Sequence, residues 1–272
     1  MKRPDVTLEN CDAVYDFYGS YNADQRRARI AHALIGKVFK PDVTFLDSET
    51  EDLVRQAVEH VDVTILACKH VNMNDPLHLV ALTGIVRTFG DLAGATVIPS
   101  KRPLFDLRIR RWIDDLGAIP TFRKKDLVRD DGTLDDASSV ELSHATERLI
   151  DVCAKLMCRG KTLAIFPESE RSAKIEGSDP SRVNRLKDGV ARMYLKSIDS
   201  VTIAIVPLGL CYDETKSMTA KRKPSMVVGN PLTKRYSDAA ALMADLAEAM
   251  QAAQTAAFER QTAQRVANTE GP

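Results

Sequence analysis

The stretch Val63-Thr-Ile-Leu-Ala-Cys-Lys-His70-Val-Asn-Met-Asn-Asp75-Pro76 combines a clear strand signal with a candidate for chemistry. Residues 63–67 are a short apolar run rich in β-branched side chains, which predicts a buried strand. Asp75-Pro76 predicts a helix start, with Asp75 as the N-cap and Pro76 as the first helical residue. His70 falls in the turn between the two elements. Because α/β sheets bind ligands at the carboxyl ends of their strands, this turn is a candidate site.

Strands and helices continue to alternate on either side of this stretch. Further strands are predicted at 95–99, 118–122, 162–166, 201–208 and 226–228. Helices are predicted at 22–40, from 48 with a capping box completed at 51, at 104–116, 139–158 and 189–198, and from 238. This order predicts an α/β fold with a mixed, largely parallel sheet flanked by helices and preceded by an N-terminal helical segment. The chain is divided into a helical segment (1–60), an α/β domain (61–235) and a C-terminal helix with a frayed tail (236–272).

The composition argues against several classes of protein. The 38 Lys and Arg balance the 38 Asp and Glu, so no global field attracts nucleic acid, and no nucleic-acid partner is expected. The five cysteines include no C-x-x-C pair, which argues against a disulfide framework or a zinc site and favours a reducing compartment. The histidines occur singly, and we expect no metal. With no signal peptide and no apolar run long enough to span a bilayer, a cytoplasmic protein is expected.

The spacing of His70 and Asp75 suggests a specific chemistry. The turn can place the Asp75 carboxylate against one imidazole nitrogen, which fixes the tautomer and leaves the other nitrogen as a base. The chain has no G-x-S-x-G elbow and no phosphate loop, so the base would activate a substrate hydroxyl directly. Taken alone, the spacing is also explained by a helix-capping aspartate beside an unrelated histidine.

Polar residues also follow two other predicted strands. Phe166-Pro-Glu168-Ser-Glu-Arg171-Ser172 leaves the strand at 162–166, and Arg171 has the planar fork that grips a phosphate. Gly117-Ala-Ile-Pro-Thr-Phe-Arg123 leaves another strand, with Lys124 behind it. Each segment, considered by itself, is equally compatible with a solvated loop.

Taken in order, these segments resemble the motifs of the glycerol-3-phosphate and lysophosphatidate acyltransferases. That family has H-x-x-x-x-D, then G-x-I-x-x-x-R, then F-P-E-G-T-R-S, then an apolar V-P block. The matching segments here are 70–75, 117–123, 166–172 and 205–208, and the resemblance spans 61–235.

The resemblance implies a role for each matching residue. His70 is the general base, and Asp75 orients it. Arg123 and Arg171 bind the acceptor phosphate, helped by Lys69 or Lys124, while Glu168 shapes the loop of the third motif. The implied reaction moves a fatty acyl group from acyl-coenzyme A or acyl carrier protein to a hydroxyl of a glycerol-phosphate or lysophospholipid. It needs no cofactor.

One departure keeps other acceptors open. Ser169-Glu170 replaces the Gly-Thr of the third motif, and a carboxylate beside Arg171 repels phosphate or competes for the guanidinium. The alternatives are an acyltransferase for a non-phosphate lipid, or a catalytically weak protein of the same fold that binds a lipid or an acyl thioester.

The segment 101–112 mixes Lys and Arg with Leu, Phe, Ile and the single Trp. A basic amphipathic helix of this kind suits an anionic membrane surface, although a core-facing helix with a solvated basic side fits equally well. We therefore expect peripheral association with the inner face of the membrane, without a transmembrane span.

Overall fold

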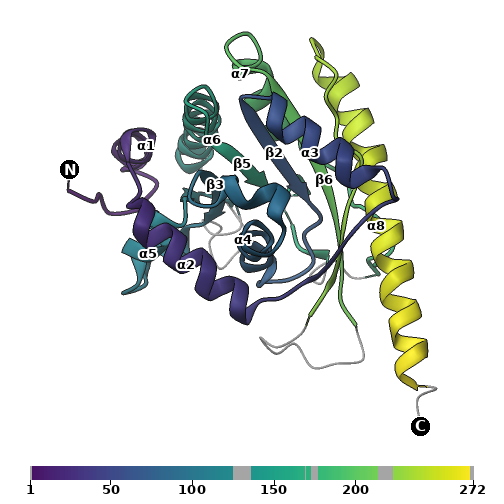
Figure 1. Ribbon diagram of the computed structural model, residues 1–272. Coiled ribbons are helices and arrows are strands. Elements are labelled where there is room, and N and C mark those ends of the chain that lie inside the picture. The colour runs from purple at the N-terminus through teal and green to yellow at the C-terminus, as the bar shows by residue number, and fades with distance from the viewer. Residues whose placement is uncertain (1, 125–135, 169, 173–176, 214–222, 270–272) are drawn as a thin grey trace.

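The fold is centred on β2 (Val63–Cys68), the strand that leads into the His70 turn. The computed structural model describes residues 2–124, 136–168, 170–172, 177–213 and 223–269 (Figure 1). Every residue of β2 is buried, and its side chains alternate between two cores. Val63, Ile65 and Ala67 belong to one core, and Leu66 and Cys68 to the other. This period of two is what a strand buried on both faces requires.

Within the described residues, seven strands form one sheet in the order β1-β7-β6-β2-β5-β3-β4. The other six strands are β1 (Asp42–Phe45), β3 (Thr96–Lys101), β4 (Ala118–Thr121), β5 (Thr162–Ile165), β6 (Ile203–Cys211) and β7 (Ser225–Val228). β6, β2, β5, β3 and β4 are all parallel, so their carboxyl ends meet at one edge of the sheet. β7 is antiparallel to β6 and carries β1 beside it. The predicted mixed, largely parallel sheet is confirmed.

Helices cover both faces of the sheet (Figure 1). Residues of α2, α3, α4 and the 3-10 turn η1 pack in one core, and residues of α1, α6, α7 and α8 pack in the other. The bounds of these elements are α1 (Cys11–Ser20), α2 (Gln25–Val38), α3 (Thr50–His60), α4 (Asp75–Ile85), η1 (Arg87–Leu92), α6 (Asp136–Met157), α7 (Gly189–Ser197) and α8 (Ala239–Thr269). None of the described helices combines the length and the apolar character that a membrane span needs.

The long C-terminal helix α8 lies directly on the sheet. A Cβ atom on Gly209 of β6 would stand 2.1 Å from the carbonyl oxygen of Ala253, so only glycine permits this approach. The buried Gln254 side chain accepts a hydrogen bond of 2.8 Å from the Leu210 amide. Both contacts fix α8 across β6.

The structure differs from the sequence-based expectation near the N-terminus. Helix α1 was not predicted, and the segment 1–60 also contributes strand β1 to the sheet. Helix α3 begins at Thr50, where the Asp47 carboxylate accepts hydrogen bonds from the Glu49 and Thr50 amides. The predicted capping box starting at 48 is therefore wrong, because the N-cap is Glu49 and the Asp47 carboxylate binds the amides at the helix start.

The predicted helix at 104–116 is also wrong. The chain forms a 3-10 turn, η2 (Arg102–Asp106), and then the short helix α5 (Arg110–Asp115). Phe105 turns into the core against Tyr18, with ring centroids 5.7 Å apart, and Leu107 adopts an extended conformation. These two residues interrupt the helix.

Candidate active site

The turn after β2 brings His70 and Asp75 together. His70 Nδ1 lies 2.8 Å from Asp75 Oδ2, and the same oxygen accepts hydrogen bonds from the Val71 amide at 2.5 Å and the Asn72 amide at 2.8 Å. Asp75 is wholly buried. The N-cap of α4 is Asn74, so the predicted capping role of Asp75 is wrong. Its carboxylate binds the preceding turn instead, because that turn presents amides and an imidazole to it.

Tyr212 binds the second carboxylate oxygen of Asp75. Its hydroxyl donates to Asp75 Oδ1 at 2.7 Å. Burial, with the Asp75 charge as a smaller cause, raises the pKa of Tyr212 well above its usual value, so this hydroxyl keeps its proton. The sequence analysis missed Tyr212. The only available signal was its position directly after an apolar strand that ends at the same edge of the sheet as β2.

The hydrogen bond to Asp75 sets the tautomer of His70. Because a carboxylate only accepts, Nδ1 carries the hydrogen and Nε2 is left with a lone pair. Nε2 has no hydrogen-bond partner among the described residues, and 18% of the side chain is exposed. The ring stacks on Phe166 with centroids 4.3 Å apart and planes at 28°. The imidazole is thus oriented on one side and open on the other, as a general base requires.

A second buried carboxylate, that of Glu168, binds the backbone of the His70 turn. Its Oε2 accepts from the His70 amide at 2.8 Å, and its Oε1 accepts from the Asn184 amide at 2.6 Å and from Lys69 Nζ at 3.3 Å. Lys69 Nζ also donates to Ser172 Oγ and to the Arg182 carbonyl.

Lys69 and Glu168 are both buried, and these contacts occupy all three ammonium protons of Lys69. The structure therefore places both side chains beneath the His70 turn, where they join the loops after β2 and β5. They do not line an open surface.

The loop of the third motif lies against the turn. The Ser172 amide donates to the His70 carbonyl at 2.8 Å. Arg171, next to it, is half-buried and makes no ion pair with another described residue. Glu170 is exposed, and Ser169 lies outside the described residues.

Arg123 is placed farther from His70. It is half-buried and follows β4, which is separated from β2 by β5 and β3. With strands ~4.8 Å apart, the axes of β2 and β4 are roughly 14 Å apart. Exposed Lys124 follows it. The structure thus brings Lys69, His70, Asp75 and Glu168 into contact, and it places Arg171 and Arg123 on loops along the same edge of the sheet.

A second histidine, His78, lies one turn further along α4 and was not predicted. Its buried ring packs between Phe39 and Tyr212, with centroids 5.5 Å and 5.9 Å away. Neither ring nitrogen has a hydrogen-bond partner among the described residues. Burial lowers the pKa of His78 to about 4. It is therefore neutral at neutral pH and does not compete with His70 for Asp75.

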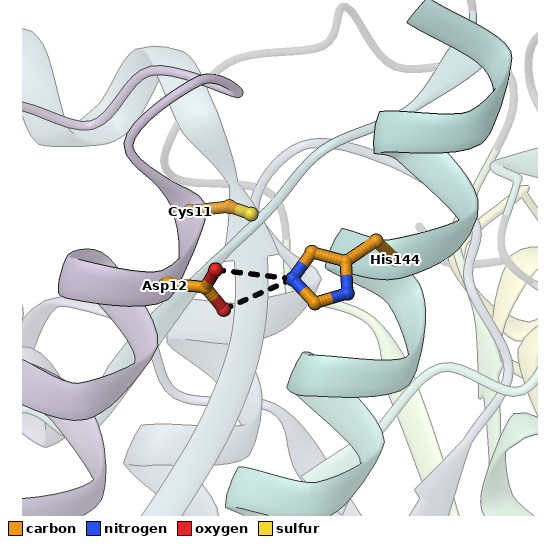
Figure 2. A group of neighbouring side chains, drawn as sticks. All are labelled: Cys11, Asp12 and His144. Carbon is orange, nitrogen blue, oxygen red and sulfur yellow. Dashed lines mark hydrogen bonds and ion pairs between the residues drawn. The ribbon is translucent and has the colours of Figure 1, made fainter. Parts of the chain in front are cut away.

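One group of potential metal ligands comes together elsewhere in the described residues, as Figure 2 shows. His144 Nε2 of α6 lies 3.0 Å from an Asp12 carboxylate oxygen of α1, next to the thiol of Cys11. Arg148 also donates to that oxygen at 2.8 Å. Burial raises the pKa of Cys11, which keeps the thiol protonated. A guanidinium on the carboxylate disfavours a cation, so this group is best described as an ion pair that joins α1 and α6.

The first prediction concerns the buried Lys69–Glu168 pair. Glu168→Gln should destabilise the protein by about 3–5 kcal/mol, because the Lys69 ammonium is left buried without its counter-charge. Urea unfolding measures the difference. Glu248→Gln, at an exposed glutamate of α8, is the control and should stay within about 0.5 kcal/mol of the wild type. The double variant Lys69→Met/Glu168→Gln should recover part of the loss. A Glu168→Gln protein as stable as the wild type would contradict this account.

Comparison with family models places these residues in a known group. A model described as Acyltransferase matches residues 54–211, which is more than half of the chain. A search of curated proteins found no match. The matched region runs from α3 to the end of β6 and contains all four motifs named above. The chain therefore belongs to the acyltransferase family.

Proposed function

We propose that this acyltransferase moves a fatty acyl chain from a thioester of coenzyme A or acyl carrier protein to a hydroxyl of a glycerol-phosphate or lysophospholipid. The observation that carries the proposal is the bound and oriented imidazole of His70. Asp75 holds its Nδ1, and Nε2 remains open. We further propose that the protein works in the cytoplasm at the inner face of a membrane and uses no cofactor.

In the proposed reaction, His70 Nε2 takes the proton of the acceptor hydroxyl as its oxygen attacks the thioester carbonyl. The new C–O bond forms, the tetrahedral intermediate collapses, and the C–S bond breaks. The departing thiolate takes the proton back from Nε2. Asp75 stabilises the imidazolium while it exists, because a buried opposite charge favours the charged form.

Direct transfer, without an acyl-enzyme, is supported by the state of the nearby nucleophiles. Cys68 is fully buried, and burial raises its pKa well above the usual value, so the thiol stays protonated. The Ser172 hydroxyl accepts hydrogen bonds from Lys69 and Asn184 and is also buried. Neither group is prepared to attack a thioester.

One backbone amide of the turn is available for the carbonyl oxygen. The amides of His70, Val71, Asn72 and Asn74 all donate to side chains. The Met73 amide has no acceptor among the described residues. We therefore assign the Met73 amide as the donor that stabilises the oxyanion formed from the thioester carbonyl.

The remaining residues receive two kinds of role. We assign Lys69 and Glu168 to positioning of the turn, since both are buried and fully engaged. We assign Arg171 and Arg123 to the acceptor phosphate, because both follow strands that end at the edge where His70 lies. The exposed carboxylate of Glu170 beside Arg171 favours a second candidate, an acyltransferase for a lipid acceptor without a phosphate.

The central prediction is that the purified protein releases free thiol from palmitoyl-coenzyme A only when lysophosphatidate or glycerol-3-phosphate is present. His70→Ala should lower this rate by about 10²–10⁴-fold, because the general base is lost. Thermal unfolding of the variant checks that it is folded. A folded wild-type protein that binds the thioester but releases no thiol with any acceptor would instead support a binding protein.

A second prediction tests Tyr212 as a positioning residue. Tyr212→Phe keeps the ring and removes the hydroxyl, and kcat should fall about tenfold with little change in KM. The fall in kcat without a rise in KM is the expected signature, because Tyr212 holds Asp75 in place and does not contact the substrate. Tyr236→Phe is the matched control, since Tyr236 also donates to an aspartate, Asp245, away from the turn. Equal effects of the two variants would assign Tyr212 a merely structural role.

A third prediction distinguishes the two classes of acceptor. Arg171→Ala should raise KM for a phosphate-bearing acceptor by about tenfold to a hundredfold, because a bidentate charged contact is lost. KM for monoacylglycerol, which lacks the phosphate, should not change. Arg182→Ala, at an exposed arginine of the neighbouring loop, is the control. An unchanged KM for the phosphate acceptor in Arg171→Ala would favour the non-phosphate alternative.

A further inference from the structure

Helix α2 buries mostly small residues, while three of its large aliphatic residues point outward and Ile35 packs against the core. The side facing the protein consists of Ala28, Ala31, His32 and Gly36. Gly36 lies close to α4, since a Cβ there would be 3.7 Å from the Ile85 side chain. Ile30, Leu34 and Val38 are 44%, 55% and 63% exposed. Spaced four residues apart, they form one row, here called the α2 stripe. Three large aliphatic side chains in one exposed row indicate a surface that binds a protein or a membrane.

The charged residues of helix α2 all have the same sign. Helix α2 contains no Asp or Glu. Arg26, Arg29 and Lys37 are exposed next to the stripe and make no ion pair with any described residue. Arg27 lies one turn before Ile30 on the same face, and it pairs with Asp115 of α5 and with Asp24. The partner of this surface therefore combines an apolar layer with negative charge.

The carboxyl end of α2 lies close to the catalytic turn. Phe39, directly after α2, contacts His78 one turn into α4, the helix that begins at Asp75. Met73, within the catalytic turn, is 62% exposed. The α2 stripe thus leads along the surface toward the edge of the sheet where His70 lies.

The neighbouring helix α5 extends this character. Helix α2 runs beside α5 in Figure 1, and the two are in contact. The α5 region exposes Ile109 and Trp112 together with Arg108 and Arg111. The sequence segment at 101–112 was expected to meet a membrane as one helix. The structure divides that segment and presents a longer apolar row on α2.

We propose that the α2 stripe docks on the surface of an anionic lipid bilayer. The aliphatic side chains enter the boundary between headgroups and acyl chains, and Arg26, Arg29 and Lys37 contact the lipid phosphates. This inference deepens the proposed function, since it brings the catalytic turn to the membrane that holds a lipid acceptor.

A second copy of the chain is a poorer occupant. In a two-fold dimer the same surface of each copy faces the other. The arginines and the lysine beside one stripe would then face those beside the other. Such like-charge contacts oppose association. A bilayer of anionic lipid has the opposite charge and therefore matches this surface.

The test is sedimentation of the full-length protein with vesicles, which requires no turnover. The protein should bind phosphatidylcholine vesicles that contain phosphatidylglycerol, bind vesicles of phosphatidylcholine alone much more weakly, and lose affinity as salt is raised. Trp112 is the single tryptophan of the chain, so a blue shift of its emission reports contact with lipid. Ile30→Ser/Leu34→Ser and Arg26→Glu/Arg29→Glu should each weaken binding by roughly tenfold.

Matched controls use exposed residues of α6. Val140, 71% exposed, is changed to Ser, and Lys155 is changed to Glu. Both should bind as the wild type does, and so should His70→Ala, which separates docking from catalysis. The α2 variants should keep the wild-type melting temperature and its turnover of a soluble acceptor.

Three results would overturn the proposal. The first is α2 variants that bind vesicles as tightly as the wild type. The second is a wild type that binds no vesicles at low salt. The third is a wild type that light scattering shows to be a dimer, together with α2 variants that are monomers. That result would assign the stripe to an interface between copies. Loss of vesicle binding in the α2 variants with intact turnover would support the proposal whatever acceptor is finally identified.

Discussion

Two carboxylates that are buried from water hold the turn between β2 and α4. A buried charge is tolerated only when donors surround it, and here the donors come from three separate parts of the sheet edge. Asp75 binds its own turn and Tyr212 after β6, while Glu168 after β5 binds the His70 amide and Lys69. The position of the imidazole therefore depends on the register of β2 with both of its neighbours. A shift of either strand would leave a charge without its partners.

This arrangement explains which parts of the site the sequence could predict. His70 and Asp75 lie five residues apart, so a single turn determines their contact, and the pair was found from spacing. Tyr212 and Asn184 contact the same two carboxylates from far along the chain, and only the paired strands bring them there. The family resemblance implied that Lys69 helps to bind the acceptor phosphate and that Glu168 shapes the loop of the third motif. Residue type does not distinguish a charged group at the surface from one paired inside, and the structure places both inside.

The same limit applies to the fold. The apolar strands 63–67, 162–166 and 201–208 were predicted because runs of buried β-branched residues are distinctive. β1 is four residues long and only half-buried, so it carries no such signal. The helical period of Ile30, Leu34 and Val38 predicted α2 correctly, but a period shows only that a helix has two faces. Which face of α2 is buried depends on the close packing of small residues such as Gly36 against α4. That packing depends on the side chains of α4, so the α2 sequence alone does not reveal it.

Helix α4 links the His70 turn to helix α2. Its first residue is Asp75, and its flank packs against α2 beneath the exposed stripe. Because α4 is one rigid element of eleven residues, the imidazole and the outer face of α2 keep a fixed relation to each other. Docking of the α2 stripe, as proposed, would therefore hold the imidazole at a defined height above the lipid layer.

The edge strand β1 pairs with a strand that is synthesised much later in the chain. β1 hydrogen-bonds to β7, and β7 pairs with β6, on which α8 lies across Gly209. On the ribosome, β1 emerges early, but its partner emerges only after the region 54–211 that the family shares. Until β7 has been made, β1 has no partner strand and its hydrogen-bonding edge is open. Open strand edges promote pairing with other chains. β1 finds its place in the sheet only once β7 has been made.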